Sequence, residues 1–135
     1  MINKMMLLVL FALARADTDG SFNYMGYTGY SGEILLNPIT GSSMFYWMFN
    51  SVGGDMGHDT RPLVIWTGGG PGYASEIGLF VEGLAPFTID ENGNAVPNPA
   101  SWALRCHILA IDFPYGTGFS YASLYQDYQN TTVTT

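Results

Sequence analysis

Apolar runs along the chain alternate with clusters of glycine, proline and polar residues, and these clusters mark where the predicted elements begin and end. Two strand-like runs come first, at residues 30–37 (YSGEILLN) and 44–51 (MFYWMFNS), and the turn-forming sequence PITGSS separates them. Two such runs on either side of a short turn predict an antiparallel hairpin. A glycine-rich polar loop, VGGDMGHDTRP, follows the hairpin.

The next apolar run, residues 63–66 (LVIW), is continuous and lies between a proline and a series of glycines. A continuous run of this kind is typical of a strand that is buried on both faces of a parallel sheet. After the glycines, residues 74–84 carry apolar side chains at helical spacing and predict a short amphipathic helix. The apolar positions of this helix are Ile77, Phe80, Val81 and Leu84.

A second buried strand is predicted at residues 108–113 (ILAIDF), and it leads into another loop rich in glycine and proline. Between the helix and this strand, the pair Asn92 and Gly93 predicts a tight turn. The order of elements is therefore hairpin, strand, helix, strand. This order indicates the α/β class, and we expect the arrangement to be incomplete because nothing further in the sequence covers the two buried strands.

The N-terminal segment has the pattern of a secretory signal peptide. Lys4 supplies a positive charge, residues 5–13 form a short apolar core, and residues 14–16 (ARA) have the small-x-small form of a cleavage site. The segment is too short for a transmembrane helix, and no later stretch is long and apolar enough to span a membrane. We expect cleavage after Ala16 and a mature domain of residues 17–135. The alternative is a buried amphipathic segment that belongs to the fold.

Composition and charge narrow the class of protein further. The 135 residues are enough for one domain, and 47% are hydrophobic, which excludes a disordered tail. The formal net charge is −7, from 4 Lys and Arg against 11 Asp and Glu. Such a chain has no basic face to neutralise phosphates, so we expect no nucleic-acid partner.

Cysteine and histidine give no sign of a metal centre. Cys106 and His107 are adjacent on a predicted strand, so they point to opposite faces and cannot act together. A buried structural thiol is the better interpretation of Cys106, and His58 lies in a polar loop where a solvated histidine is expected. No cluster has the spacing of metal ligands, so we predict neither a metal site nor a cofactor.

The glycine loop after residues 63–66 is the strongest candidate for chemistry. A phosphate-binding loop would place Lys and Ser or Thr after its glycines, but Gly72 is followed by Tyr73, Ala74 and Ser75. An oxyanion hole of the α/β-hydrolase type takes one backbone N–H from a glycine-rich loop between a strand and its helix. Glycine suits such a loop because it lets the backbone approach a substrate closely. A tight structural turn remains the alternative.

Several blocks of the sequence resemble the serine carboxypeptidase family. The stretch IWTGGGPGYASEIGLFVEGLAPF is similar to the family signature W-L-N-G-G-P-G-C-S-S followed by G-L-F-x-E-x-G-P. NPASW resembles the family's N-P-x-S-W, ILAIDFPYGTGFSYA resembles its D-x-P-x-G-x-G-F-S-Y block, and the two strand-like runs resemble its opening hairpin. The resemblance extends from about Tyr27 to Ala122. It implies an incomplete α/β-hydrolase fold with an N-terminal hairpin, a glycine-loop strand–helix unit and a following strand.

The resemblance also implies roles for four residues. Gly70 matches the loop glycine whose backbone N–H serves the oxyanion hole. Gly68 and Gly69 match the positions that hold the C-terminal carboxylate of a peptide substrate. Glu82 matches a family glutamate that shares a proton with a second glutamate beside the nucleophile, which raises one pKa of the pair.

The chain departs from the family pattern in the same loop. Gly68 stands where the family has Asn, so a side-chain donor for the carboxylate is missing. Tyr73 stands where the family has Cys, which removes the usual disulfide, and Ala74 replaces a Ser. Some relatives with altered loops act as acyltransferases on small-molecule esters, and this activity is an alternative to removal of C-terminal residues.

The family's nucleophile, Asp and His lie beyond the matched segment. Ser120 in GFSYA resembles an elbow serine, but it follows a loop rather than a strand, so we interpret it as structural. We therefore expect an N-terminal fragment of a serine-type carboxypeptidase that is inactive by itself and binds a peptide C-terminus only when completed by a further region. The alternative is a short non-catalytic pseudoenzyme or binding protein. The family and the sequon at Asn130 both suit a secreted protein or one of the lysosomal or vacuolar lumen.

Overall fold

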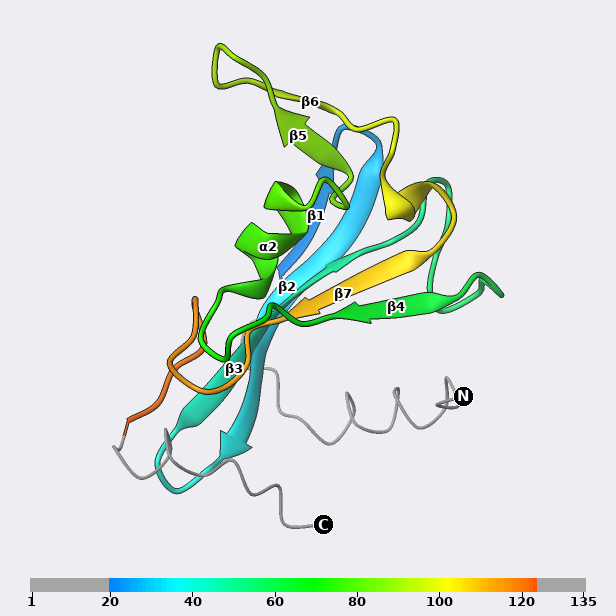
Figure 1. Cartoon of the computed structure of the whole chain (residues 1–135). Helices are drawn as coiled ribbons and strands as arrows, with labels where there is room; N and C mark the ends of the chain where they lie inside the picture. Colours follow the sequence, from blue (N-terminus) through cyan, green and yellow to red (C-terminus); the bar gives the residue numbers. More distant parts are fainter. Residues whose placement is uncertain (1–19, 124–135) are drawn as a thin grey trace.

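The structure, a computed structural model, describes residues 20–123. Its main feature is a mixed five-stranded sheet with the strand order β1-β2-β3-β7-β4 (Figure 1). The predicted signal peptide, residues 1–16, and the sequon at Asn130 lie outside the described residues. The strands of the sheet are β1 (Gly20–Tyr24), β2 (Tyr27–Asn37), β3 (Ser42–Phe49), β4 (Leu63–Trp66) and β7 (His107–Ile111).

The predicted hairpin is confirmed as the antiparallel pair of β2 and β3. Its turn follows from local chemistry, because the Asn37 side chain accepts the backbone N–H of Ile39 at 3.1 Å, and Gly41 adopts a φ of +76°. Strand β2 begins at Tyr27, earlier than the sequence pattern predicts, because the short strand β1 pairs with its first half. The sequence pattern gave no prediction for β1.

The two strands predicted on either side of the helix are present as β4 and β7, and they pair in parallel. Strand β7 lies between β3 and β4, and its first four residues are buried, which confirms a buried strand here. It ends at Ile111, two residues earlier than predicted. The expectation that β4 is buried on both faces is wrong for the described chain. Strand β4 is at the edge of the sheet, and Ile65 is 42% exposed.

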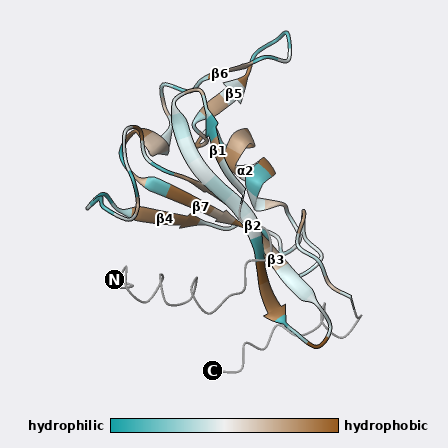
Figure 2. Cartoon of the chain, turned by 180° about the vertical axis from the view of Figure 1, so that it is seen from behind, coloured by the Kyte–Doolittle hydropathy of each residue, from teal (hydrophilic) through white to brown (hydrophobic). Residues whose placement is uncertain are grey.

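The core occupies both faces of the sheet because side chains alternate along each strand. On one face, Phe49, Ile108 and Leu79 of helix α2 (Ser75–Val81) belong to the larger cluster of buried side chains. On the other face, Met48 and Leu109 belong to a smaller cluster. Helix α2 covers the first face (Figure 1), and the view from the opposite side shows β4 and most of β7 coloured as hydrophobic (Figure 2).

Helix α2 confirms the predicted helix and part of its predicted apolar face, since Phe80 and Leu84 pack against the larger core cluster. The helix is shorter than residues 74–84, and Ile77 and Val81 are 52% and 71% exposed. The buried side is formed instead by Ser75, Glu76, Gly78 and Leu79. The hydrogen bonds of Ser75 at the start of the helix fix how the helix is rotated. The small residues Ser75 and Gly78 on its buried side allow the helix to pack closely on the sheet.

The remaining elements lie between α2 and β7. Strands β5 (Phe87–Ile89) and β6 (Ala95–Pro97) form a small hairpin around the turn predicted at Asn92 and Gly93, where Gly93 has a φ of +81°. A short 3-10 helix, η1 (Trp102–Leu104), leads into β7. Among residues 20–123, the helices are too short to cross a lipid bilayer.

Candidate functional site

Two glycine-rich loops meet at one edge of the sheet. The first, residues 67–74, leaves the carboxyl end of β4 and enters α2, and the second, residues 113–120, leaves the carboxyl end of β7. Because β4 and β7 are parallel, with Trp66 opposite Ala110, both loops begin at the same edge. Ligands of open α/β sheets characteristically bind at this edge.

Ser75 anchors the first loop to the end of β7. Its hydroxyl accepts the backbone N–H of Gly68 at 2.8 Å and donates to the carbonyl oxygen of Ile111. Ser75 is fully buried, although its two partners leave both hydrogen bonds only partly buried. The position of Gly68 is therefore set by contacts with strand β7 as well as by its own neighbours in the chain.

Asp112 holds both loops through one carboxylate. Its Oδ1 accepts the backbone N–H of Ser75 at 2.6 Å, and its Oδ2 accepts the backbone N–H of Phe119 at 3.0 Å. The first bond satisfies an N–H at the start of α2 that the residue before the helix, Ala74, leaves without a side-chain cap. The residue is 1% exposed. Gly118, with a φ of +54°, leaves room for this carboxylate, which a Cβ at that position would overlap.

The middle of the first loop faces solvent with its backbone donors unused. Gly69 and Gly70 are both exposed, and within residues 20–123 neither N–H has a hydrogen-bond acceptor. Gly70 has a φ of +134° and Gly72 a φ of +105°, conformations that L side chains rarely adopt. Exposed backbone N–H groups on an anchored loop are suited to receive an oxygen of a ligand.

The loop path leaves no space for a side chain at position 68. A Cβ built on Gly68 would lie 2.5 Å from the carbonyl oxygen of Tyr73 and 3.2 Å from its Cδ1. The Tyr73 ring continues over Gly78 of α2, where a Cβ would lie 2.9 Å from its Cε1. The two residues that depart from the expected signature, Gly68 and Tyr73, are thus in direct contact.

The predicted site residues fall into two places. Gly68, Gly69 and Gly70 are consecutive in the anchored loop, as the sequence requires. Glu82 lies at the opposite end of α2, is exposed, and donates its backbone N–H to the carbonyl of Gly78. Its predicted role in substrate binding stays a prediction.

A different glutamate of the same helix is buried beside the loop anchor. Glu76 is 7% exposed, and burial together with a side-chain hydrogen bond to Asp112 raises its pKa to about 7. The sequence pattern assigned no role to Glu76. The available signal was a glutamate directly after the serine that enters the helix, but its contact with Asp112 depends on the tertiary fold.

Ser120 is structural, as expected. It is buried, its hydroxyl donates to the carbonyl oxygen of Asp112 at 2.7 Å, and it accepts the backbone N–H of Phe45 at 2.8 Å. Both hydrogen bonds tie the second loop to the neighbouring strands. A hydroxyl held in this way is not presented to a substrate.

The two histidines lie at the other end of β4 and β7. His58 is exposed and pairs with Asp55 at 2.9 Å, in agreement with the solvated interpretation. His107 is fully buried at the start of β7, where its Nδ1 accepts the backbone N–H of Ser51 at 3.3 Å and its Nε2 lies 3.6 Å from Asp59. In residues 20–123 no group of three or more His, Cys, Asp or Glu side chains is arranged to hold a metal ion.

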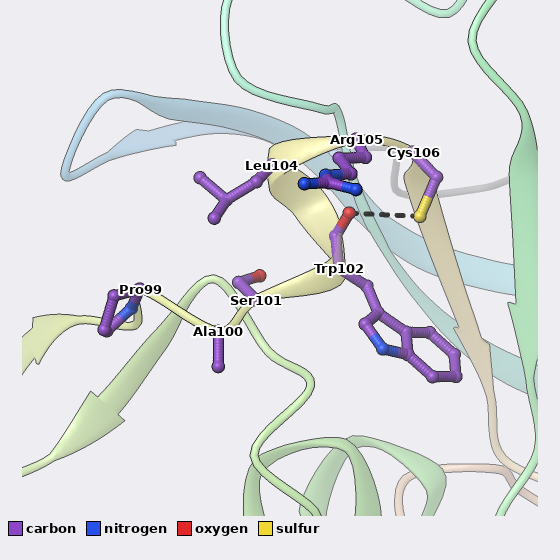
Figure 3. A pocket seen from close by; sticks show the side chains of 7 residues that line it. All are labelled: Pro99, Ala100, Ser101, Trp102, Leu104, Arg105 and Cys106. Atoms are coloured by element: carbon purple, nitrogen blue, oxygen red, sulfur yellow. Dashed lines mark hydrogen bonds between the residues drawn. The ribbon is translucent and has the colours of Figure 1, made fainter.

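Cys106 borders a surface hollow of about 390 Å³ around η1 (Figure 3). Its thiol donates to the carbonyl oxygen of Trp102 at 3.1 Å, and burial raises its pKa. The cysteine is free and buried, which confirms the structural interpretation. A thiol with a raised pKa and an internal hydrogen bond is a poor nucleophile.

Comparison with known proteins identifies the family. A sequence profile described as serine carboxypeptidase matches residues 18–135. The chain belongs to the serine carboxypeptidase family. Serine carboxypeptidase-like 32 of Arabidopsis thaliana is 33% identical over 91% of this chain, and carboxypeptidase Y homolog A of Arthroderma otae is 44% identical over 72% of it.

A solved structure supports the same relationship. Kex1, a prohormone-processing carboxypeptidase from Saccharomyces cerevisiae, superposes with a TM-score of 0.60 at 33% identity over 76% of this chain. The chain spans 28% of the Arabidopsis relative, 17% of the Arthroderma relative and 22% of the solved Kex1 chain. The mixed sheet with few helices thus resembles part of a serine carboxypeptidase.

Proposed function

We propose that this chain supplies the oxyanion-hole and substrate-carboxylate loop of a serine-type carboxypeptidase, which removes residues from the C-termini of peptides within an α/β-hydrolase fold. One observation carries the proposal: the exposed N–H groups of Gly69 and Gly70 have no acceptor within residues 20–123, although both flanks of their loop are anchored. A preorganised donor of this kind stabilises the charge that develops on a carbonyl oxygen. The signature glycines occupy the same place in the sequence.

The division of roles follows from the order of the glycines. Gly70 donates its N–H to the oxyanion, and Gly69 donates to the terminal carboxylate of the peptide. Gly68 contributes no side chain, because the Tyr73 carbonyl fills the space that one would need. Glu82 assists at the carboxylate once a second carboxyl lies beside it. The chain by itself is not expected to hydrolyse peptides, because residues 1–135 contain no G-x-S-x-G sequence.

A backbone substitution in a chimera tests the role of Gly70. Residues 20–123 replace the matching N-terminal segment of Kex1, and glycolic acid replaces Gly70, which exchanges only the N–H for an ester oxygen. Loss of one oxyanion donor lowers kcat about 10²–10³-fold. The same exchange at Gly72 is the matched control and should leave kcat within a few-fold. An unchanged kcat after the exchange at Gly70, in an active chimera, contradicts the proposal.

A second function is favoured by one feature of the loop. Gly68 lacks the side-chain amide that would donate a hydrogen bond to a free carboxylate. Its absence suits acyl transfer from small-molecule esters, which have no such carboxylate. The same chimera separates the two functions. Carboxypeptidase activity requires faster cleavage of a peptide with a free C-terminus than of its amide. Equal rates for the two peptides, together with rapid turnover of a small ester, favour the acyltransferase.

We also propose that the product is secreted or resides in the lysosomal or vacuolar lumen. The pattern of residues 4–16 and the sequon at Asn130 support this location. A lumenal compartment would also suit a family that works on peptides outside the cytosol.

A further inference from the structure

The carboxyl groups of Glu76 and Asp112 form a buried pair directly behind the glycine loop. Glu76 is 7% and Asp112 1% exposed, and they lie on different elements, α2 and the end of β7. Asp112 already accepts two backbone N–H groups, from Ser75 and Phe119, so its ionised form is well satisfied. Both oxygens of the Asp112 carboxyl are therefore engaged by backbone donors.

The Glu76 carboxyl receives a hydrogen bond from its own backbone N–H, which satisfies only part of the group. Its Oε2 is buried and finds no hydrogen-bond partner among residues 20–123. A buried carboxylate oxygen without a donor is costly, whereas a protonated carboxyl can donate its own hydrogen to Asp112. This environment explains why the pKa of Glu76 is raised to about 7.

Among the described residues, the two loops that flank the start of α2 contribute no positive charge that could offset a second negative charge. The elements packed against the start of α2 are β7, the loop of residues 67–74 and the loop of residues 113–120. The Asp112 carboxyl is hydrogen-bonded to Glu76. The titratable residues of the two loops are Tyr73 and Tyr115, and neither loop contains Lys, Arg or His. His107 is at the opposite end of β7.

We infer that Glu76 is a positioning residue whose single proton determines how firmly the glycine loop is held. While protonated, Glu76 donates to Asp112 and leaves the bond from Asp112 to the Ser75 N–H intact. Ionisation places two carboxylates side by side in a buried site, and the repulsion weakens the bonds from Asp112 to Ser75 and Phe119. Because the Ser75 hydroxyl holds the N–H of Gly68, the change reaches the donors of Gly69 and Gly70.

The consequence for catalysis rests on the proposed oxyanion role of the loop, whereas the coupling between proton and loop does not. We expect an ordered loop on the acidic side of neutrality and a looser loop at alkaline pH. Glu76 would thus act on the loop alone and would not contact the substrate or the reacting atoms.

NMR titration of the full chain tests this coupling from about pH 5 to about pH 9. The side-chain ¹³Cδ of Glu76 should titrate with a midpoint near 7, and the amide signals of Gly68, Ser75 and Phe119 should move with the same midpoint. In Glu76→Gln, which mimics the protonated side chain, these amide signals should stay at their acidic positions. Glu91→Gln, a change at an exposed glutamate in the β5–β6 turn, is the matched control and should behave as the wild type.

Two results would overturn the inference: a Glu76 midpoint near the ordinary value of 4.5, or amide shifts that persist in Glu76→Gln. If the variant does not fold, the wild-type titration still tests the coupling between the Glu76 proton and the loop. Unequal midpoints for Glu76 and the three amides would contradict this coupling. The titration involves no substrate. An inactive chimera with a positive titration would therefore contradict only the proposed function.

Discussion

The carbonyl oxygen of Tyr73 lies 2.5 Å from the place that a Cβ on Gly68 would occupy. Real Cβ atoms do not approach backbone atoms so closely, and the carbonyl cannot rotate away without moving the loop. Gly68→Ala should therefore lower the free energy of unfolding by about 1–3 kcal/mol, as overpacking does elsewhere. Urea unfolding measures this loss.

Gly69→Ala is the matched control for this substitution. A Cβ on Gly69 meets nothing within 4 Å, so its effect should stay within about 0.5 kcal/mol. Equal effects of the two substitutions would show that the Tyr73 carbonyl does not restrict position 68. Because of the same contact, Gly68→Asn alone should not restore binding of the substrate carboxylate.

Removal of the Ser75 hydroxyl should release the first loop from β7. Ser75→Ala leaves the partly buried Gly68 N–H without its acceptor and removes a donor from the Ile111 carbonyl. A buried unsatisfied group costs about 1–3 kcal/mol. Hydrogen exchange of the Gly68 amide should accelerate, whereas Ser21→Ala, at an exposed serine of β1, should leave it unchanged. Slow exchange in Ser75→Ala would mean that another group holds the loop.

Stability should fall as the pH rises through the range in which Glu76 ionises. Its pKa is about 7 in the folded chain and near 4.5 when unfolded, so between these values the folded state binds the extra proton. Stability therefore decreases from about pH 4.5 to about pH 7 and stays low above it. Thermal unfolding should show Glu76→Gln equal to wild type at the acidic end and more stable at the alkaline end. Parallel curves for the two proteins would rule out Glu76 as the source.

Signal-peptide cleavage should expose Asp17 as the new N-terminus. The small residues at positions 14 and 16 fit the pocket of a signal peptidase, and Ala16→Leu should block cleavage there. N-terminal sequencing of the product from a secreting host checks both statements. Ala12→Leu, a change inside the apolar core, is the control and should still be cleaved. Retention of Met1 in the secreted wild-type chain would contradict the pattern.

The parts of the fold that depend on local sequence could be predicted. The run LVIW between a proline and glycines predicted β4 as a strand of a parallel sheet, and the glycines located the candidate loop. The helix face was predicted correctly at Phe80 and Leu84 and wrongly at Ile77 and Val81. The hydrogen bond from the Ser75 N–H to Asp112 helps to turn Leu79 toward the sheet.

The site could be predicted only where it is continuous in sequence. Gly68 to Gly70 form one segment, so their pattern is visible without a structure. The hydrogen bond that anchors the loop joins Ser75 to Asp112, which lies 37 positions later in the chain. No local sequence pattern indicates that these two residues are in contact. Glu76 resembles an ordinary acidic residue in the first turn of a helix until Asp112 is placed beside it.

The carboxylate of Asp112 makes two separate stretches of sequence depend on each other. The loop that offers donors to a substrate and the loop of residues 113–120 share this side chain, and Gly118 stays small to make room for it. Substitutions in the two loops should consequently show epistasis, with the effect of one depending on the residue present in the other. An engineer who wishes to change the substrate preference of the first loop has to treat both loops as one design unit.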